Sequence, residues 1–156
     1  MRIRIQDQKE GRQPVGITLQ RRDFRAQYGN CTQGLFIFQN PRRIPKDQPC
    51  INVGQELSTE LSKIPPDERS IRASVCLADI VASYKAATLE HIEVLFTPSL
   101  RLDAIEAIRA ACRNRKLCVA WPGIIQDNTL TYATPDSPEY YQADIARYTD
   151  TYIITD

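Results

Sequence analysis

Apolar residues recur along this chain in two kinds of segment, short continuous runs and longer stretches with helical spacing. A continuous run of a few apolar residues is typical of a strand that is buried on both faces of a sheet. Leu35–Phe38 is the first such run and is apolar throughout. The sequence predicts further strands at Cys50–Val53, at Ala86–Phe96 with a loop or helical continuation, and at Lys116–Trp121, Thr129–Ala133 and Thr151–Thr155.

Spacings of three and four between apolar residues predict helices over Gln55–Ile64 and Leu102–Cys112. Pro65-Pro66 ends the first of them, and Asp67, Glu68 and Ser70 then give the N-terminal signals of a longer helix. The predicted apolar face of that longer helix consists of Ile71, Val75, Leu77, Ile80, Val81 and Tyr84.

Helices that alternate with short apolar strands predict a layered α/β fold with a mainly parallel sheet. We expect one α/β domain over residues 35–156, preceded by a poorly defined basic N-terminal arm over residues 1–34. Pro41, Pro45 and Pro49 argue against a helix between the first two strands. Thr129–Ala133 is expected to form a hairpin at the sheet edge, and Pro138–Arg147 a short helix.

Composition fits a folded chain, with 42% hydrophobic and 25% charged residues among 156. The formal net charge is +1, which gives no global field to hold the chain on nucleic acid or on an anionic membrane. Residues 1–25 are locally basic, and this arm either touches nucleic acid or an acidic partner or is simply solvated. Its basic residues are Arg2, Arg4, Lys9, Arg12, Arg21, Arg22 and Arg25.

The five cysteines are Cys31, Cys50, Cys76, Cys112 and Cys118, and no two of them are separated by two residues. This spacing excludes a zinc knuckle and a thioredoxin-type pair, so we interpret all five as structural. An odd number of cysteines fits a reducing compartment and predicts a cytoplasmic protein. No apolar run reaches the roughly 20 residues that span a bilayer, so no membrane partner is expected.

The candidate chemistry lies at strand ends, because parallel sheets bind ligands beyond the carboxyl ends of their strands. Glu90 and Glu93 follow the third predicted strand, where they either hold a hydrated magnesium ion and orient a water or are solvated loop carboxylates. The single histidine, His91, lies between them and is interpreted as a polar residue at a strand end. None of the six glycines is followed by lysine, so no phosphate-binding loop is recognisable.

Several segments from Ile51 onward together carry a resemblance to a known family. They are Ile51-Asn52-Val53-Gly54-Gln55-Glu56-Leu57-Ser58, Ile92-Glu93-Val94-Leu95-Phe96, Pro98-Ser99-Leu100-Arg101-Leu102-Asp103, Arg113-Asn114-Arg115, Val119-Ala120-Trp121-Pro122-Gly123, Leu130-Thr131-Tyr132-Ala133, Pro135 and Pro138-Glu139-Tyr140. In these segments the chain resembles BrxF, the small P-loop protein of BREX phage-defence systems. The resemblance covers residues 51–140 and implies a P-loop-NTPase-like fold, whose N-terminal third stays uncertain.

The resemblance also assigns roles at the predicted site. It implies that Glu90-His91-Ile92-Glu93 is the Walker B element, with Glu90 near magnesium and Glu93 retained as a catalytic carboxylate. It implies that Arg113-Asn114-Arg115 is a polar sensor, with Asn114 near the terminal phosphate of ATP. The family's phosphate-binding loop is missing here, so the N-terminal third either has diverged or is read in a shifted frame.

Two functions from different classes are expected. The first is an accessory protein that docks to other phage-defence proteins, through its basic arm and the edge that carries Glu90 and Glu93, without normal ATP hydrolysis. The second is a residual ATPase that binds ATP and magnesium through an unconventional phosphate site made by Arg42, Arg43 and Lys46. Convergence of Arg42 and Arg43 on Glu90 would favour the second.

Overall fold

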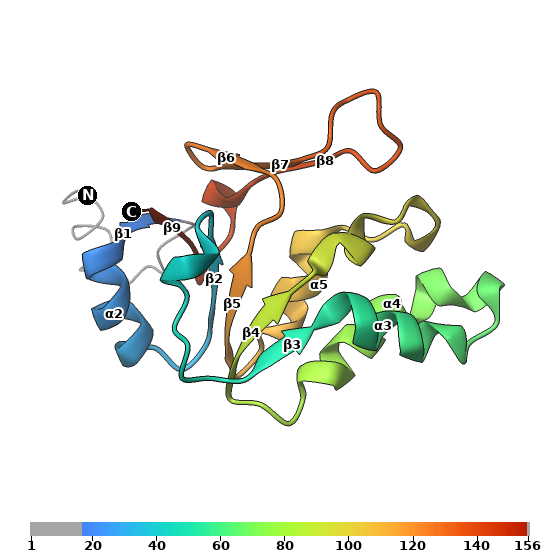
Figure 1. The fold of residues 1–156 in the computed structure, drawn as a ribbon, viewed down its shortest axis with the longest axis horizontal. Coiled ribbons are helices and arrows are strands. Elements are labelled where there is room, and N and C mark those ends of the chain that lie inside the picture. Colours follow the sequence, from blue (N-terminus) through green and yellow to red (C-terminus); the bar gives the residue numbers. More distant parts are fainter. Residues whose placement is uncertain (1–16, 156) are drawn as a thin grey trace.

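The computed structural model describes residues 17–155 and contains two β-sheets (Figure 1). The larger sheet has six strands in the order β1-β9-β2-β5-β4-β3, and all of its neighbouring strands are parallel. This confirms the predicted α/β class with a mainly parallel sheet. The strands are β1 (Ile17–Gln20), β2 (Gly34–Phe38), β3 (Cys50–Asn52), β4 (Ala86–Glu90), β5 (Lys116–Ala120) and β9 (Thr151–Thr155).

Strand β2 lies at the centre of this sheet, between β9 and β5, and all of its residues are buried. Because side chains alternate along a strand, Leu35 and Ile37 face one side of the sheet and Phe36 and Phe38 the other. The unbroken apolar run in the sequence is therefore explained by two separate cores, one on each face of the same strand.

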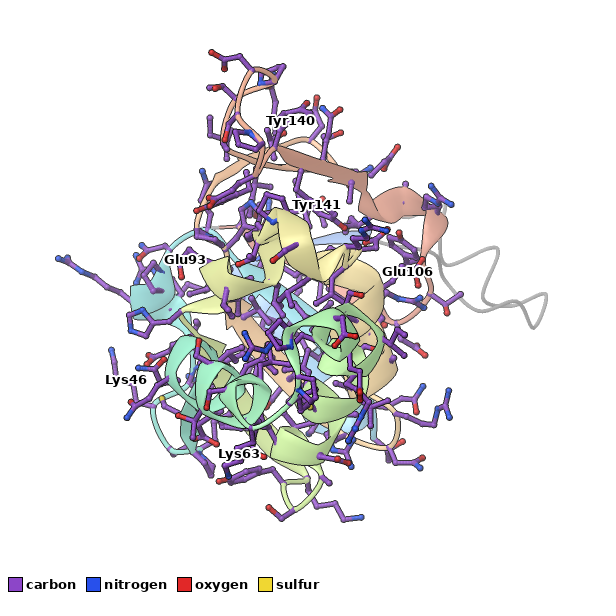
Figure 2. All side chains as sticks on the ribbon, turned by 90° about the vertical axis from the view of Figure 1, so that its right-hand side faces the viewer. Lys46, Lys63, Glu93, Glu106, Tyr140 and Tyr141 are labelled. Atoms are coloured by element: carbon purple, nitrogen blue, oxygen red, sulfur yellow. The ribbon has the colours of Figure 1, made fainter. Side chains whose placement is uncertain are left out.

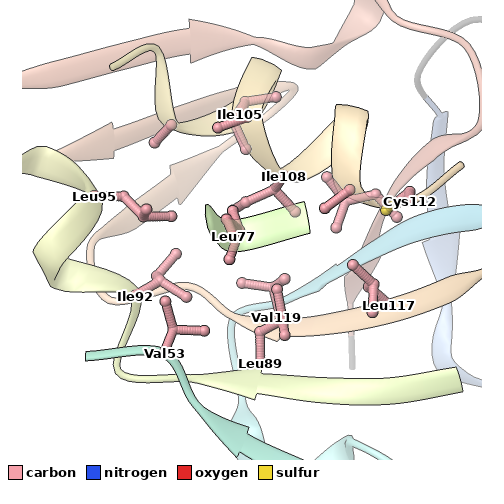
Figure 3. Close-up of a cluster of buried hydrophobic side chains, with 14 of the residues drawn as sticks. Val53, Leu77, Leu89, Ile92, Leu95, Ile105, Ile108, Cys112, Leu117 and Val119 are labelled. Carbon is pink, nitrogen blue, oxygen red and sulfur yellow. The ribbon is translucent and has the colours of Figure 1, made fainter. Parts of the chain in front are cut away.

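Three helices cover the face of Leu35 and Ile37, namely α3 (Val53–Ser62), α4 (Arg69–Val81) and α5 (Ala104–Ala111). Asn52 and Asp103 begin two of them, because each side chain accepts a hydrogen bond from a backbone N–H in the first turn. We call this side of the sheet the helical face. Figure 3 shows its core, in which Leu77 of α4 and Ile108 of α5 lie over Leu89 and Val119 of the sheet.

Helix α4 forms where the sequence predicts it, and part of the predicted face lies in the core. Leu77 and Val81 of that face are buried, whereas Ile71 and Val75 are exposed, at 76% and 52%. Ala73 and Cys76, which the prediction did not include, are buried as well. Small residues at Ala73 and Cys76 let α4 approach its neighbours closely, and this packing outweighed the size of the apolar side chains that the prediction followed.

The sequence predicted that the domain starts at Leu35, but the fold begins earlier in the chain. Strand β1 pairs with β9, and helix α2 (Arg21–Asn30) packs on the face of Phe36 and Phe38 through its buried residue Phe24. Neither element was predicted, because most residues of this stretch are polar or charged and only a few apolar residues mark the side that contacts the sheet. The basic residues Arg2, Arg4, Lys9 and Arg12 of the predicted arm lie outside the described residues.

The smaller sheet stands over the carboxyl ends of the large one (Figure 1) and contains β6 (Ile124–Gln126), β7 (Thr129–Tyr132) and β8 (Tyr141–Asp144). Its strands are antiparallel, and Figure 2 shows Tyr141 between this sheet and the body of the domain. Gly123 is required at its entrance, because a Cβ there would lie 1.9 Å from the carbonyl oxygen of Thr131.

Two predictions about this region are wrong. The hairpin of Thr129–Ala133 belongs to the separate sheet and not to the edge of the main one. Pro138–Arg147 forms strand β8 and a three-residue 3₁₀ turn instead of a short helix. Pairing with β7 and the tertiary contacts of Tyr141 decide the conformation there, and neither is local in sequence.

All five cysteines are unpaired thiols, as expected, and Cys76, Cys112 and Cys118 are buried. Over residues 17–155, no helix has the length and apolar character needed to cross a membrane.

Candidate functional site

The predicted carboxylates lie at the carboxyl end of β4. Glu90 is the last residue of that strand, stands opposite Asn52 of β3 and is exposed. His91 follows in the left-handed conformation, with φ 57°, and turns the chain into the 3₁₀ helix that carries the exposed Glu93. Both carboxylates therefore face solvent beside the end of the strand.

Aromatic side chains fill the space next to these carboxylates. Phe96 stacks on Tyr132 with ring centroids 4.1 Å apart and meets Trp121 edge-on at 5.6 Å. Tyr141 completes the set, 5.4 Å from Phe96. We call these four residues the aromatic cluster, which links the 3₁₀ helix after β4, the end of β5 and the small sheet.

Tyr141 fixes the aromatic cluster to helix α5. Its hydroxyl donates a hydrogen bond to Asp103 at 2.5 Å and accepts one from the backbone N–H of Ile105 at 3.1 Å. Burial, and then the bond to Asp103, raises the pKa of Tyr141. Trp121 is held from the other side, because its indole N–H donates to the carbonyl of Thr131. The crevice beyond β4 and β5, where an open parallel sheet binds its ligand, is thus packed with fixed rings.

The predicted polar sensor lies at the amino ends of the strands, opposite to the ends that carry Glu90. Arg113, Asn114 and Arg115 precede β5, whereas Glu90 ends the adjacent parallel strand β4. Five residues of strand, roughly 16 Å, separate the two ends. The structure therefore does not bring Asn114 or its neighbouring arginines together with Glu90.

Arg115 and Asn114 have structural contacts where they are. The Arg115 guanidinium donates hydrogen bonds to the carbonyl oxygens of Tyr84, Ala111 and Ala82, which lie at the ends of α4 and α5. Asn114 has φ 64°, and its backbone N–H donates to the side chain of Gln33. These bonds end two helices and shape a turn, while Arg113 is exposed at the same turn.

The segment after β2 carries no backbone cradle for phosphate. Strand β2 runs into a 3₁₀ turn over Pro41–Arg43, in which the Asn40 side chain accepts a hydrogen bond from the Arg42 N–H. Pro45 and Pro49 remove further N–H donors. The backbone groups that a phosphate-binding loop would aim at its ligand are here used in the turn or missing.

Arg42 and Arg43 instead line a groove on the other face of the sheet, with a volume of about 1120 Å³. We call it the basic groove. Helix α2 forms one wall, the segment Arg42–Asp47 forms the other, and Phe24, Tyr28 and Ile44 lie at its base. Its basic residues are Arg21, Arg22, Arg25, Arg42, Arg43 and Lys46, and its acidic residue is Asp47. Among the described residues that line it, neither Glu90 nor Glu93 is present.

The two walls of the basic groove are tied together at its base. The Tyr28 hydroxyl donates to the side chain of Gln48 at 2.5 Å, and Gln48 donates to the Thr88 hydroxyl at 3.0 Å. Lys116 donates to the Tyr28 carbonyl at 2.7 Å and lies over the Tyr28 ring. Burial is the main cause that raises the pKa of Tyr28, so its hydroxyl keeps its proton. The groove is therefore held open by the fold itself.

Five of the six cations of the groove are exposed and form no salt bridge with another described residue. Within residues 17–155, salt bridges join Lys63 to Glu60 and Arg109 to Glu106, and none involves Arg42 or Lys46. The three α2 arginines are likewise exposed and form no ion pair with another described residue. Figure 2 shows Lys46 projecting away from the body of the domain.

Sequence reasoning found one wall of this groove and missed the other. Arg42, Arg43 and Lys46 were predicted as a phosphate site, whereas Arg21, Arg22 and Arg25 were assigned to a basic arm that either touches nucleic acid or an acidic partner or is simply solvated. A signal was present, because Phe24 and Tyr28 are four residues apart and mark the buried side of a helix. The arginines then fall on the side that borders the groove.

Among residues 17–155, no group of three or more His, Cys, Asp or Glu side chains lies close enough together to hold a metal ion. No family model, curated protein or solved structure matches this chain.

Proposed function

We propose that this protein is an accessory component of a bacterial phage-defence system of the BREX type. It is a cytoplasmic protein with a P-loop-like arrangement of strands and helices, and it works by docking to other proteins of that system without hydrolysing ATP. The resemblance over residues 51–140 is the basis for the system, and the geometry at the carboxyl ends of the strands is the basis for the mode of action.

The observation that carries the docking mode is the aromatic cluster. Phe96, Trp121, Tyr132 and Tyr141 pack against one another beyond the carboxyl ends of β4 and β5, on the side of the sheet where open parallel sheets bind their ligands. Phosphoryl transfer depends on positioned charge around the transferred group. Here Glu90 has neither a lysine nor a backbone cradle opposite it, so hydrolysis lacks its main source of stabilisation.

The docking surface is the edge beside this cluster. Glu90 and Glu93 are exposed there, and Ile124 of the small sheet is 64% exposed. Exposed carboxylates at the end of β4 and an exposed apolar side chain on the small sheet above it fit a partner surface that offers both basic and apolar groups.

A second function, nucleotide binding without a phosphate-binding loop, is favoured by one observation. Arg42, Arg43 and Lys46 do converge, although on the basic groove and not on Glu90. A nucleotide held there would bind away from the Walker-B-like carboxylates and would not be hydrolysed by them.

Calorimetric titration with ATP and magnesium, at protein concentrations that reveal even millimolar affinity, separates these two functions. We expect no binding heat from the folded protein. Binding that disappears in Glu90→Gln would overturn the docking mode in favour of an ATPase-like site. Binding that disappears in Arg43→Ala but persists in Glu90→Gln would favour the nucleotide function in the groove.

Co-purification with tagged proteins encoded beside it in the same defence operon tests docking directly. The Glu90→Lys/Glu93→Lys variant is expected to lose its partner. The matched control is Glu60→Lys/Asp79→Lys, which makes the same charge change at exposed positions on the helical face and should keep the partner. Equal loss in both variants, or no partner with the natural chain, would contradict the proposal.

A further inference from the structure

We propose that the basic groove is a binding site for single-stranded nucleic acid, which it holds by the phosphodiester backbone without sequence preference. This inference goes beyond docking to proteins, and it is independent of that proposal because the groove and the carboxylate edge share no residue. It starts from how unevenly the charge of the chain is distributed.

The groove gathers positive charge that the chain as a whole does not have. Its lining contains six basic side chains and one acidic side chain, a formal charge of +5. The complete chain carries only +1, so everything outside the groove is net negative. A concave surface lined by one sign of charge concentrates the opposite charge of a ligand and accelerates its association.

The first turn of helix α2 carries basic residues that lower the stability of the helix. Arg21 and Arg22 occupy its first turn, where the positive end of the helix dipole disfavours cations, and the residue before them, Gln20, is a poor N-terminal cap. Acidic residues stabilise such a helix end, and Asp23 in the same turn offsets only part of the cost of the two arginines. A phosphate in the groove offsets both unfavourable features, because it meets the arginines and the helix end from the same side.

The shape of the groove favours a single strand over a double helix. The cations stand on two opposed walls, α2 and the segment Arg42–Asp47, so a thin chain of phosphates meets charge on both sides. Proteins bind single strands with a positively charged groove that follows the backbone and with aromatic rings that stack on the bases, and this groove supplies the first of the two.

The same features argue against a free nucleotide. The base of the groove offers no stacking surface, because Phe24 is only 7% exposed and Lys116 covers the Tyr28 ring. The three prolines of the neighbouring segment leave few backbone donors to recognise a base or a compact triphosphate. What the groove offers is several separate positive charges, and a polymer with regularly spaced phosphates meets more of them than one nucleotide does.

Fluorescence anisotropy with a labelled oligothymidylate of about 20 nucleotides, which is longer than a typical site, tests the proposal. If about five phosphates are neutralised, affinity should fall roughly 100-fold between about 50 and 200 mM salt. The Arg42→Glu/Lys46→Glu variant should bind about 100-fold more weakly at about 50 mM salt, and its salt dependence should be shallower by about two phosphate contacts.

The matched control is Lys63→Glu/Arg72→Glu, which makes the same change in net charge on two exposed residues, Lys63 just after α3 and Arg72 of α4. It should bind oligothymidylate like the natural chain, and thermal melts followed by circular dichroism should show both variants folded. Equal weakening in the control would overturn the site, as would absence of binding at about 50 mM salt. Equal or tighter binding of a duplex, of ATP or of polyglutamate would overturn the single-stranded ligand.

Discussion

The two faces of the main sheet are built from the same strands but are covered in different ways. On the helical face, α3, α4 and α5 bury a continuous core that includes Leu77, Leu89 and Ile108. On the opposite face, α2 and the proline-containing segment after β2 cover a small set of aromatic rings around Phe36. We call this second side the groove face. Strand β2 serves both, since it sends alternate side chains to each.

The helical face provides the stability of the domain, and the groove face provides the binding surface. The helical face is covered by three helices and buries enough apolar area to hold the domain together. The groove face is covered by one helix with one buried side chain and by a segment whose prolines restrict it, and the space between them stays open as the basic groove. A thin cover leaves cationic side chains in water, where they can meet a ligand.

Truncating a core side chain should have the largest effect on stability. On the helical face it should destabilise the whole domain, and on the groove face only helix α2. Leu77→Ala removes a fully buried side chain from the helical face and is expected to lower the free energy of unfolding by about 3 kcal/mol. Phe24→Ala removes the contact that holds α2, so it should release that helix while the rest of the domain stays folded. Urea denaturation measures the first effect, and hydrogen exchange resolved by segment measures the second.

Hydrogen exchange also provides the control for this contrast. In Phe24→Ala, the amides of α4 and α5 should stay as protected as in the natural chain. If they exchange as fast as the amides of α2, the two faces unfold as one unit and the comparison is wrong.

Alkaline pH should destabilise both faces to a smaller extent. Burial is the main cause that raises the pKa of Cys112, on the helical face, and of Cys118, on the groove face, to about 12 each. A raised thiol pKa gives stability that is complete below the unfolded pKa, near 9, and is lost as pH rises toward the folded value. Between about pH 8 and pH 10, each thiol should therefore cost roughly 1–2 kcal/mol of unfolding free energy.

Alanine at each thiol assigns this loss. Cys112→Ala and Cys118→Ala should each remove about half of the thiol-dependent decline, measured by urea denaturation across that pH range. A decline that is unchanged in both variants would mean that other groups, such as the buried tyrosines, cause it.

Charge at the start of α2 should have the smallest effect, and its sign is informative. Arg22→Glu places an acid in the first turn of the helix and should raise the free energy of unfolding by about 0.5 kcal/mol at low salt. The same change at Arg113, just after the end of α5, should lower it, because cations are favoured at that helix end. Thermal melts of the two variants give both signs, and a destabilising Arg22→Glu would remove the argument that this helix end is strained by its charges.

Six strands, β2, β3, β4, β5, β7 and β9, were predicted because their patterns are local, whereas β1, β6 and β8 were not. Leu35–Phe38 and Thr151–Thr155 are apolar or β-branched runs with clear ends, and both form strands of the sheet. Pro138–Arg147 was predicted as a helix but contains strand β8. Pairing with β7 and the hydrogen bonds of the Tyr141 hydroxyl stabilise the strand more than local helical spacing would stabilise a helix. Helix α4 was located correctly, but the side that faces the core was decided by close approach at small residues.

The predicted site was divided by the fold. Glu90 and Glu93 do lie at a carboxyl strand end, as their position in the chain required. Asn114 and its neighbouring arginines precede β5, whereas Glu90 ends the adjacent strand β4. Because these two strands are parallel, the two sets of residues lie at opposite ends of the strands and do not meet. Arg42 and Arg43 lie on the groove face, since the segment after β2 crosses that side of the sheet.

By itself, the sequence determined the alternation of strands and helices, the lack of a glycine-lysine phosphate loop and the identity of the charged residues. These depend on composition and on contacts within a few residues. Only the tertiary structure decided which charges share a surface, because helix α2 with Arg25 and the segment with Arg42 pack on the same face of β2 and form the two walls of one groove. It also decided that aromatic rings close the crevice beside Glu90, since those rings come from segments that meet only when the small sheet folds over the large one.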